Sequence, residues 1–152
     1  MKREQVLLDA GPLIGLYNEN DQWHKKCKSF FSNETRYDYT LTHAVLYETI
    51  FQIQKNKDAK SASASVMRLL HQITSHVLFL HPIEESFIPR IAVLRAKYLD
   101  KTIDVADMSL VLAAEDLQIE KIVTIDKRDF GFLTFKKGAH KKTNFQIILP
   151  EA

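Results

Sequence analysis

The chain has 152 residues, of which 45% are hydrophobic and 26% are charged, and its formal net charge is +2 at pH 7. This composition excludes an intrinsically disordered chain, and the 4 glycines and 4 prolines exclude a collagen-like or linker-like class. The only cysteine, Cys27, excludes an intrachain disulfide and a zinc site built from cysteines.

The length and the uninterrupted pattern predict one domain over residues 1–152. The apolar run near the N-terminus stops at Asp9 and is too short for a signal peptide. No apolar stretch approaches the roughly 20 residues that cross a bilayer. We therefore expect a cytoplasmic, soluble protein without a membrane partner.

Short β-prone runs alternate with helical patterns along the chain. Strands are predicted at residues 5–8, 39–42, 77–80, 121–125 and 145–149. Helices are predicted at residues 13–17, 22–32 (with Asp21 as N-cap), 44–55, 59–73, 84–98 and 104–117. The basic run at residues 136–142 is expected to form an exposed hairpin. This alternation predicts an α/β fold with three layers, α/β/α, around a small central parallel sheet.

Two acids follow predicted strands. Asp9 comes after the first strand and Asp126 after the fourth. Ligands of parallel sheets bind outside the carboxyl ends of the strands, so both residues are candidates for a site. A helix N-cap is the alternative interpretation for each. Thr124, two residues before Asp126, is a candidate hydrogen-bond partner for a carboxylate.

Other acids lie on helix stripes that should face the core. Glu48 shares a mostly apolar stripe with Val45 and Phe51, although an exposed surface position remains the alternative. Asp104 and Asp107 are three residues apart, a spacing at which like charges repel. Asp104 is placed to cap its helix. Asp107 is not, so its carboxyl group needs a nearby cation or a raised pKa.

The candidate metal ligands are therefore Asp9, Glu48, Asp107 and Asp126, with Asp104 as an accessory. Oxygen ligands without histidine or cysteine favour Mg²⁺ or Mn²⁺ over zinc. Such a site activates water for attack on a phosphodiester, which is the chemistry of a nuclease. Lys127 and Arg128 are candidates for contacts with RNA phosphates, and solvated loop charges are the alternative.

Five stretches, in this order, resemble the PIN-domain ribonucleases and, among them, the VapC-type toxins of type II toxin–antitoxin systems. They are residues 7–14, 20–24, 42–49, 104–115 and 122–130. The resemblance implies a PIN-like, Rossmann-like fold, bound Mg²⁺ or Mn²⁺, and an endoribonuclease that hydrolyses RNA with a metal-activated water. It also implies a cognate antitoxin protein whose tail covers the site, and a homodimer.

The same resemblance assigns Asp9, Glu48, Asp107 and Asp126 as the catalytic acids. Gly11 departs from the pattern, because many members have Ser or Asn two residues after the first Asp. A hydroxyl or amide that could order a metal-bound water is therefore missing at this position.

Two other functions remain open at this point. One is a non-catalytic interaction module with a PIN-like fold, and the other is a different phosphate-handling α/β domain. The first strand is not followed by the Asp-x-Asp-x-Thr run of a phosphatase. His81 and Pro82 end the third strand, where a receiver domain would have a lone Asp.

Overall fold

The computed structural model of the chain describes residues 2–139 and 141–151. A five-stranded parallel sheet has the strand order β3-β2-β1-β4-β7. Its strands are β1 (Glu4–Leu8), β2 (Tyr37–Thr42), β3 (Leu78–His81), β4 (Lys121–Val123) and β7 (Gln146–Ile148). A separate antiparallel pair consists of β5 (Thr134–Lys137) and β6 (Lys141–Asn144).

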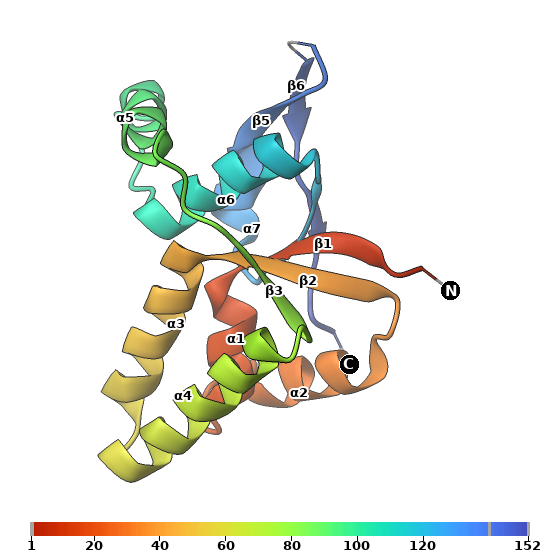
Figure 1. Ribbon diagram of the computed structural model, residues 1–152, viewed down its shortest axis with the longest axis vertical. Helices are drawn as coiled ribbons and strands as arrows, with labels where there is room; N and C mark the ends of the chain where they lie inside the picture. The colour runs from red at the N-terminus through yellow and green to blue at the C-terminus, as the bar shows by residue number, and fades with distance from the viewer. Residues whose placement is uncertain (1, 140, 152) are drawn as a thin grey trace.

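Helices cover both faces of the parallel sheet (Figure 1). One face carries α1 (Ala10–Tyr17), α2 (His24–Asn33) and α4 (Ala59–Thr74). The other carries α5 (Phe87–Lys97), α6 (Val105–Leu117) and α7 (Lys127–Phe132), together with the β5–β6 pair. The remaining helix, α3 (His43–Asn56), packs against α1 and α4 and also contacts α6. The predicted three-layer architecture is confirmed.

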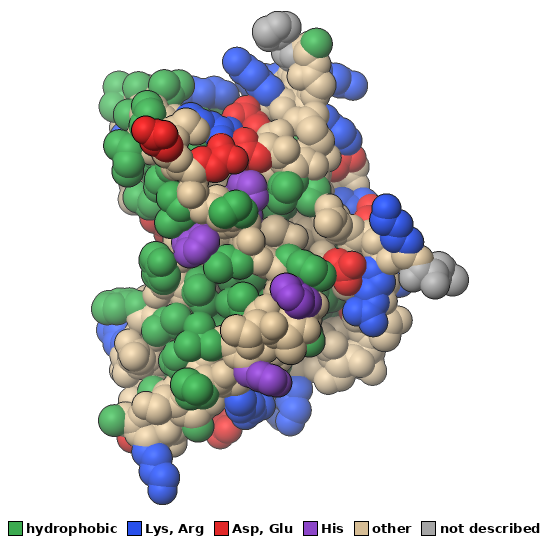
Figure 2. All heavy atoms as spheres, viewed as in Figure 1, with side chains coloured by type: hydrophobic (Ala, Val, Ile, Leu, Met, Phe, Trp, Pro, Cys, Tyr) green, Lys and Arg blue, Asp and Glu red, His purple; other side chains and the backbone are tan. Residues whose placement is uncertain are grey.

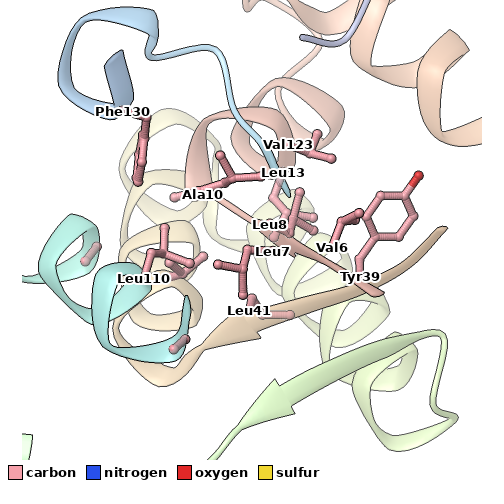
Figure 3. Close-up of a cluster of buried hydrophobic side chains, with 14 of the residues drawn as sticks. Val6, Leu7, Leu8, Ala10, Leu13, Tyr39, Leu41, Leu110, Val123 and Phe130 are labelled. Carbon is pink, nitrogen blue, oxygen red and sulfur yellow. The ribbon is translucent and has the colours of Figure 1, made fainter. Parts of the chain in front are cut away.

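The central position of β1 in the sheet explains why its sequence does not alternate between apolar and polar residues. Val6, Leu7 and Leu8 are consecutive, and each is fully buried. A strand covered on both faces needs apolar side chains in both directions. These three residues belong to one buried cluster with Leu13 of α1 and Leu110 of α6, so both helical layers share a core with the sheet (Figure 3).

The strand order also fixes where a ligand can bind. The chain runs outward from β1 to β2 and β3, then returns to place β4 on the other side of β1. The loops after β1 and β4 therefore leave a crevice between them, as at other points where strand order reverses. Asp9 directly follows β1, and Asp126 follows β4 by three residues.

Several predicted boundaries were wrong. Asp21 does not cap the second helix, which begins at His24; its carboxylate instead accepts a hydrogen bond from the Trp23 N–H at 2.7 Å and closes a turn. The helix predicted from residue 84 begins at Phe87, because residues 84–87 form a turn. Helix α7 was not predicted. The expected basic hairpin is present as β5–β6, with His140 outside the described residues.

Within the described part of the chain, no helix combines the length and the apolar character needed to cross a membrane.

Candidate metal centre

An open cleft lies beyond the carboxyl ends of β1 and β4, and all five acids selected from the sequence line it. Its volume of about 370 Å³ is several times that of a water molecule, so it has room for a hydrated ion. The acids along its wall are Asp9, Glu48, Asp104, Asp107, Asp126 and Asp129. They come from the loop after β1, from α3, and from the first turns of α6 and α7.

Asp9 is buried and held through both carboxylate oxygens. Its Oδ1 accepts a hydrogen bond from the Ala10 N–H at 2.8 Å, which caps α1. Its Oδ2 accepts one from the Thr124 hydroxyl at 2.7 Å. The same hydroxyl oxygen accepts a hydrogen bond from the Asp126 N–H at 3.0 Å. Thr124 therefore binds a carboxylate, as predicted, and ties the loop after β1 to the loop after β4.

Helices α6 and α7 begin in the same way. The Asp104 side chain caps α6 by accepting a hydrogen bond from the Asp107 N–H at 2.8 Å. The Asp126 side chain caps α7 by accepting one from the Asp129 N–H at 2.9 Å. The cap interpretation of Asp104 is thus correct, and Asp126 combines a cap with a place in the cleft. The second acid of each pair stands in the first turn, where the helix dipole favours negative charge.

Three carboxyl groups come closest together. Asp107, Asp126 and Asp129 each offer one oxygen within 4.8 Å of the others. Asp9 and Glu48 line the same cleft but lie outside this trio. Sequence reasoning missed Asp129, although the Asp-x-x-Asp spacing of residues 126–129 repeats that of residues 104–107.

Glu48 reaches the cleft from the second turn of α3. This helix is capped by Thr42, whose hydroxyl oxygen accepts a hydrogen bond from the Val45 N–H at 3.1 Å. Glu48 itself is half-buried. Its stripe is only partly covered, because Val45 is buried but Phe51 is exposed.

Burial and mutual repulsion raise the pKa values of Asp107, Glu48 and Asp9. The pKa of Asp107 rises to about 9, mainly through burial and then through the charges of Asp9 and Asp104. Burial, with the charges of Asp104 and Asp9, raises the pKa of Glu48 to about 7. The pKa of Asp9 rises to about 6 through burial, despite its hydrogen bonds. A hard divalent cation would relieve the repulsion among these carboxylates, so the donor set fits such an ion.

One basic side chain touches the cluster. The Arg128 Nε lies 3.3 Å from Asp129 Oδ1, and the Arg128 side chain is 83% exposed. Across residues 2–139 and 141–151, this is the only ion pair that a cleft acid makes. Lys127, the other candidate for RNA contact, is exposed at the start of α7.

No protein-family model matches the sequence, and no curated protein matches it in a sequence search. Solved structures do resemble it. VapC20 from Mycobacterium tuberculosis, described as a toxin that cleaves the sarcin-ricin loop, has a TM-score of 0.69 at 13% identity, over 81% of this chain and 91% of that chain. A chain of VapBC2 from Rickettsia felis, bound to a DNA fragment from its promoter, has a TM-score of 0.62 at 14% identity, over 96% and 98%.

A chain of a toxin–antitoxin complex from Klebsiella pneumoniae is similar as well, with a TM-score of 0.57 at 16% identity, over 84% of this chain and 92% of that chain. Each likeness extends over most of both chains. The chain therefore has the PIN-like α/β/α fold of VapC-type toxins, and the fold class predicted from the sequence is confirmed.

Proposed function

We propose that this chain is a Mg²⁺- or Mn²⁺-dependent endoribonuclease, acting in the cytoplasm as the toxin of a toxin–antitoxin pair, with residues 1–152 as a single nuclease domain. The observation that carries the proposal is the cluster of six acids at the point where the strand order reverses, in a fold shared with VapC20. A non-catalytic module would gain nothing from buried, mutually repelling carboxyl groups, which oppose folding.

The roles of the residues follow from their positions. When bound, a divalent cation lowers the pKa of water and neutralises charge on a phosphodiester. Asp107, Asp126 and Asp129 would hold it, because their oxygens lie closest together. Asp9 and Glu48 would complete the ligand set from the other elements that line the cleft.

The neighbouring residues orient these ligands. The hydrogen bonds from Thr124 and the Ala10 N–H offset part of the burial-induced rise in the pKa of Asp9 and fix the direction of its carboxylate. Asp104 fixes the first turn of α6, from which Asp107 projects.

RNA cleavage by the full chain tests the enzymatic part of this proposal. We expect cleavage of structured or single-stranded RNA with Mg²⁺ or Mn²⁺, leaving a 5′-phosphate and a 3′-hydroxyl, and no cleavage in EDTA. Asp107→Asn should abolish the activity. Glu85→Gln removes an equal charge from an exposed position before α5 and should leave it unchanged. Cleavage that persists in EDTA or in Asp107→Asn would refute the metal mechanism.

Two partners belong to the same proposal. The similar structures from K. pneumoniae and R. felis, a toxin–antitoxin complex and VapBC2, support a cognate antitoxin. Co-expression with the product of the adjacent reading frame should give a tight complex with suppressed cleavage.

Hydrophobic side chains gathered over α5 and along α3 support a homodimer (Figure 2). The most exposed there include Tyr47, Phe51, Ile88 and Val93. Sedimentation analysis at micromolar concentration should show a dimer.

A further inference from the structure

A lysine and an aromatic ring meet close to the acidic cleft. The Lys101 Nζ lies 5.3 Å from the centroid of the Phe132 ring. Lys101 is exposed, and it forms no ion pair with any acid in the described ranges. Phe132 is half-buried and also packs against Tyr98, with ring centroids 6.1 Å apart. Lys101 therefore has no competing acid among the described residues, and because its ammonium lies over the Phe132 ring, a base that stacks on this ring takes the place of the ammonium.

Two short stretches of chain connect this pair to the cleft. Lys101 is followed directly by Thr102 and Ile103, both of which line the cleft. Phe132 is three residues after Asp129, so the two lie on one side of α7, about one turn or ~4.5 Å apart along the helix axis. The lysine and the ring do not themselves line the cleft, but each lies within one to three residues of a residue that does, on two different elements.

The loop that carries Lys101 is held in place. The Arg95 guanidinium donates hydrogen bonds to the carbonyl oxygens of Lys101 at 2.6 Å and of Ile103 at 2.8 Å. It also donates to the carbonyl oxygen of Tyr98. One side chain therefore fixes the backbone on both sides of Thr102, and the position of Lys101 next to the cleft is part of the folded structure.

We propose that Phe132 and Lys101 form a nucleotide-positioning subsite for single-stranded RNA beside the acidic cleft. The Phe132 ring stacks on a base next to the scissile phosphate, and the Lys101 ammonium pairs with a flanking phosphate. Aromatic rings combined with basic side chains are the usual means of binding single strands. This site needs such favourable contacts, because the surrounding carboxylates repel an RNA backbone. The inference rests on the proposed function and identifies residues that position its substrate.

A second pair in the same region supplies a matched control. The Lys97 Nζ lies 5.2 Å from the centroid of the Tyr98 ring, so its local chemistry resembles that of Lys101. Tyr98, however, is only 9% exposed, and Lys97 lines a different groove, between α5 and the β5–β6 pair. Lys97→Gln removes the same charge without touching the proposed subsite.

Fluorescence anisotropy of the full chain tests the subsite without requiring cleavage. The probes are a labelled 12-nucleotide RNA and an abasic oligomer of equal length, in Mg²⁺ and in an Asp107→Asn background. Phe132→Ala should weaken binding of the RNA about 5- to 100-fold and leave binding of the abasic oligomer unchanged. Phe132→Trp should restore RNA binding. Phe132→Leu keeps apolar packing against Tyr98 but lacks the aromatic ring, so it should weaken RNA binding as much as Phe132→Ala does. If Phe132→Leu instead binds RNA like the parent, the loss in Phe132→Ala comes from disrupted packing and not from stacking.

The contribution of Lys101 is tested through the salt dependence of binding. Lys101→Gln should weaken both oligomers and reduce the slope of log affinity against log salt by ~0.7, the value for one phosphate contact on a single strand. Lys97→Gln should change neither. Equal effects of Phe132→Ala on the two oligomers, or equal effects of Lys97→Gln and Lys101→Gln, would overturn the subsite.

These outcomes separate the subsite from the nuclease function. RNA cleavage with the same KM in the parent and in Phe132→Ala would refute the subsite and leave the nuclease intact. Base-dependent binding that Phe132→Ala abolishes, in a chain that cuts no RNA, would support the subsite and refute the nuclease.

Discussion

At the scale of single residues, Thr124 holds together the two loops that supply Asp9 and Asp126. It is fully buried, and its hydroxyl both donates to Asp9 and accepts from the Asp126 N–H. Thr124→Val keeps the shape of the side chain but removes both bonds. A partly buried N–H and a buried carboxylate then lose a partner, at a cost of about 1–3 kcal/mol for the buried carboxylate and less for the N–H. The pKa of Asp9 should rise above its present value, because the Thr124 hydrogen bond lowers it.

We therefore expect Thr124→Val to need at least ~10-fold more Mg²⁺ for half-maximal thermal stabilisation at pH 7, since ~1.4 kcal/mol corresponds to a factor of ten. Raising the pH should recover part of the loss, because Asp9 then ionises again. Thr124→Ser retains the hydroxyl and should bind Mg²⁺ like the parent. Equal Mg²⁺ requirements in the Val and Ser variants would show that the hydroxyl does not position the site.

At the scale of elements, the first turns of α6 and α7 explain why Asp107 was predicted from the sequence as a site residue and Asp129 was not. The apolar stripe of α6 continues for about two turns after Asp107, to Ala114, so an acid at position 107 interrupts an otherwise apolar stripe. Helix α7 has only six residues and includes Gly131, too short a segment to show helical periodicity. Asp129 was overlooked for that reason. The positions of the strands were predictable because the strands are short runs of β-prone residues, whereas their pairing order depends on contacts distant in sequence.

The packing of α1 against the loop before α7 explains why residue 11 is a glycine. A Cβ on Gly11 would lie 2.8 Å from Ile125 Cγ1 and 3.0 Å from its Cδ1. In this chain the space that a serine would fill is taken by Ile125. Gly11→Ser should therefore destabilise the fold by about 1–3 kcal/mol, as overpacking does.

Replacing the partner provides the control. Ile125→Ala removes the clashing atoms, so Gly11→Ser should cost much less in that background when the free energy of unfolding is measured with denaturant. Gly131→Ser places the same side chain on another helical glycine with no atom within 4 Å and should be neutral or mildly stabilising. An equal cost of Gly11→Ser with and without Ile125 would contradict this explanation.

At the scale of the whole molecule, the fold concentrates negative charge at one edge of the sheet, although the net charge of the chain is only +2. The loop after β1, α3, α6 and α7 all contribute acids to that edge. In the unfolded chain these charges separate, so the folded state alone bears their burial and repulsion. Stability should consequently depend on pH and on metal in a way that reports on the cleft.

The direction of that dependence follows from the raised pKa values. Burial and neighbouring charges raise the pKa of Asp9 to about 6, of Glu48 to about 7 and of Asp107 to about 9, from ordinary values of 3.8 to 4.5. Acids with raised pKa values in the folded state stabilise it fully below their ordinary values, and the stabilisation is lost as pH rises through the folded values. In EDTA the melting temperature should therefore fall between about pH 5 and pH 9.

Asp107→Asn isolates the largest part of this effect, because asparagine has nearly the shape of a protonated aspartate. At pH 5 the folded parent keeps Asp107 protonated and only the unfolded chain ionises it, so in EDTA the difference between the two melting temperatures should be much smaller than at pH 9. At pH 9 the parent carries the charge and Asp107→Asn should melt higher, by ~2–4 °C for each kcal/mol of relieved repulsion. Excess Mg²⁺ should narrow or reverse the difference at pH 8, since a cation at 100 times its Kd stabilises the folded parent by about 2.7 kcal/mol. Titrating groups outside the cleft are common to both proteins and cancel in the comparison. A difference between the two melting temperatures that stays constant from pH 5 to pH 9, and that Mg²⁺ does not change, would remove Asp107 from the metal centre.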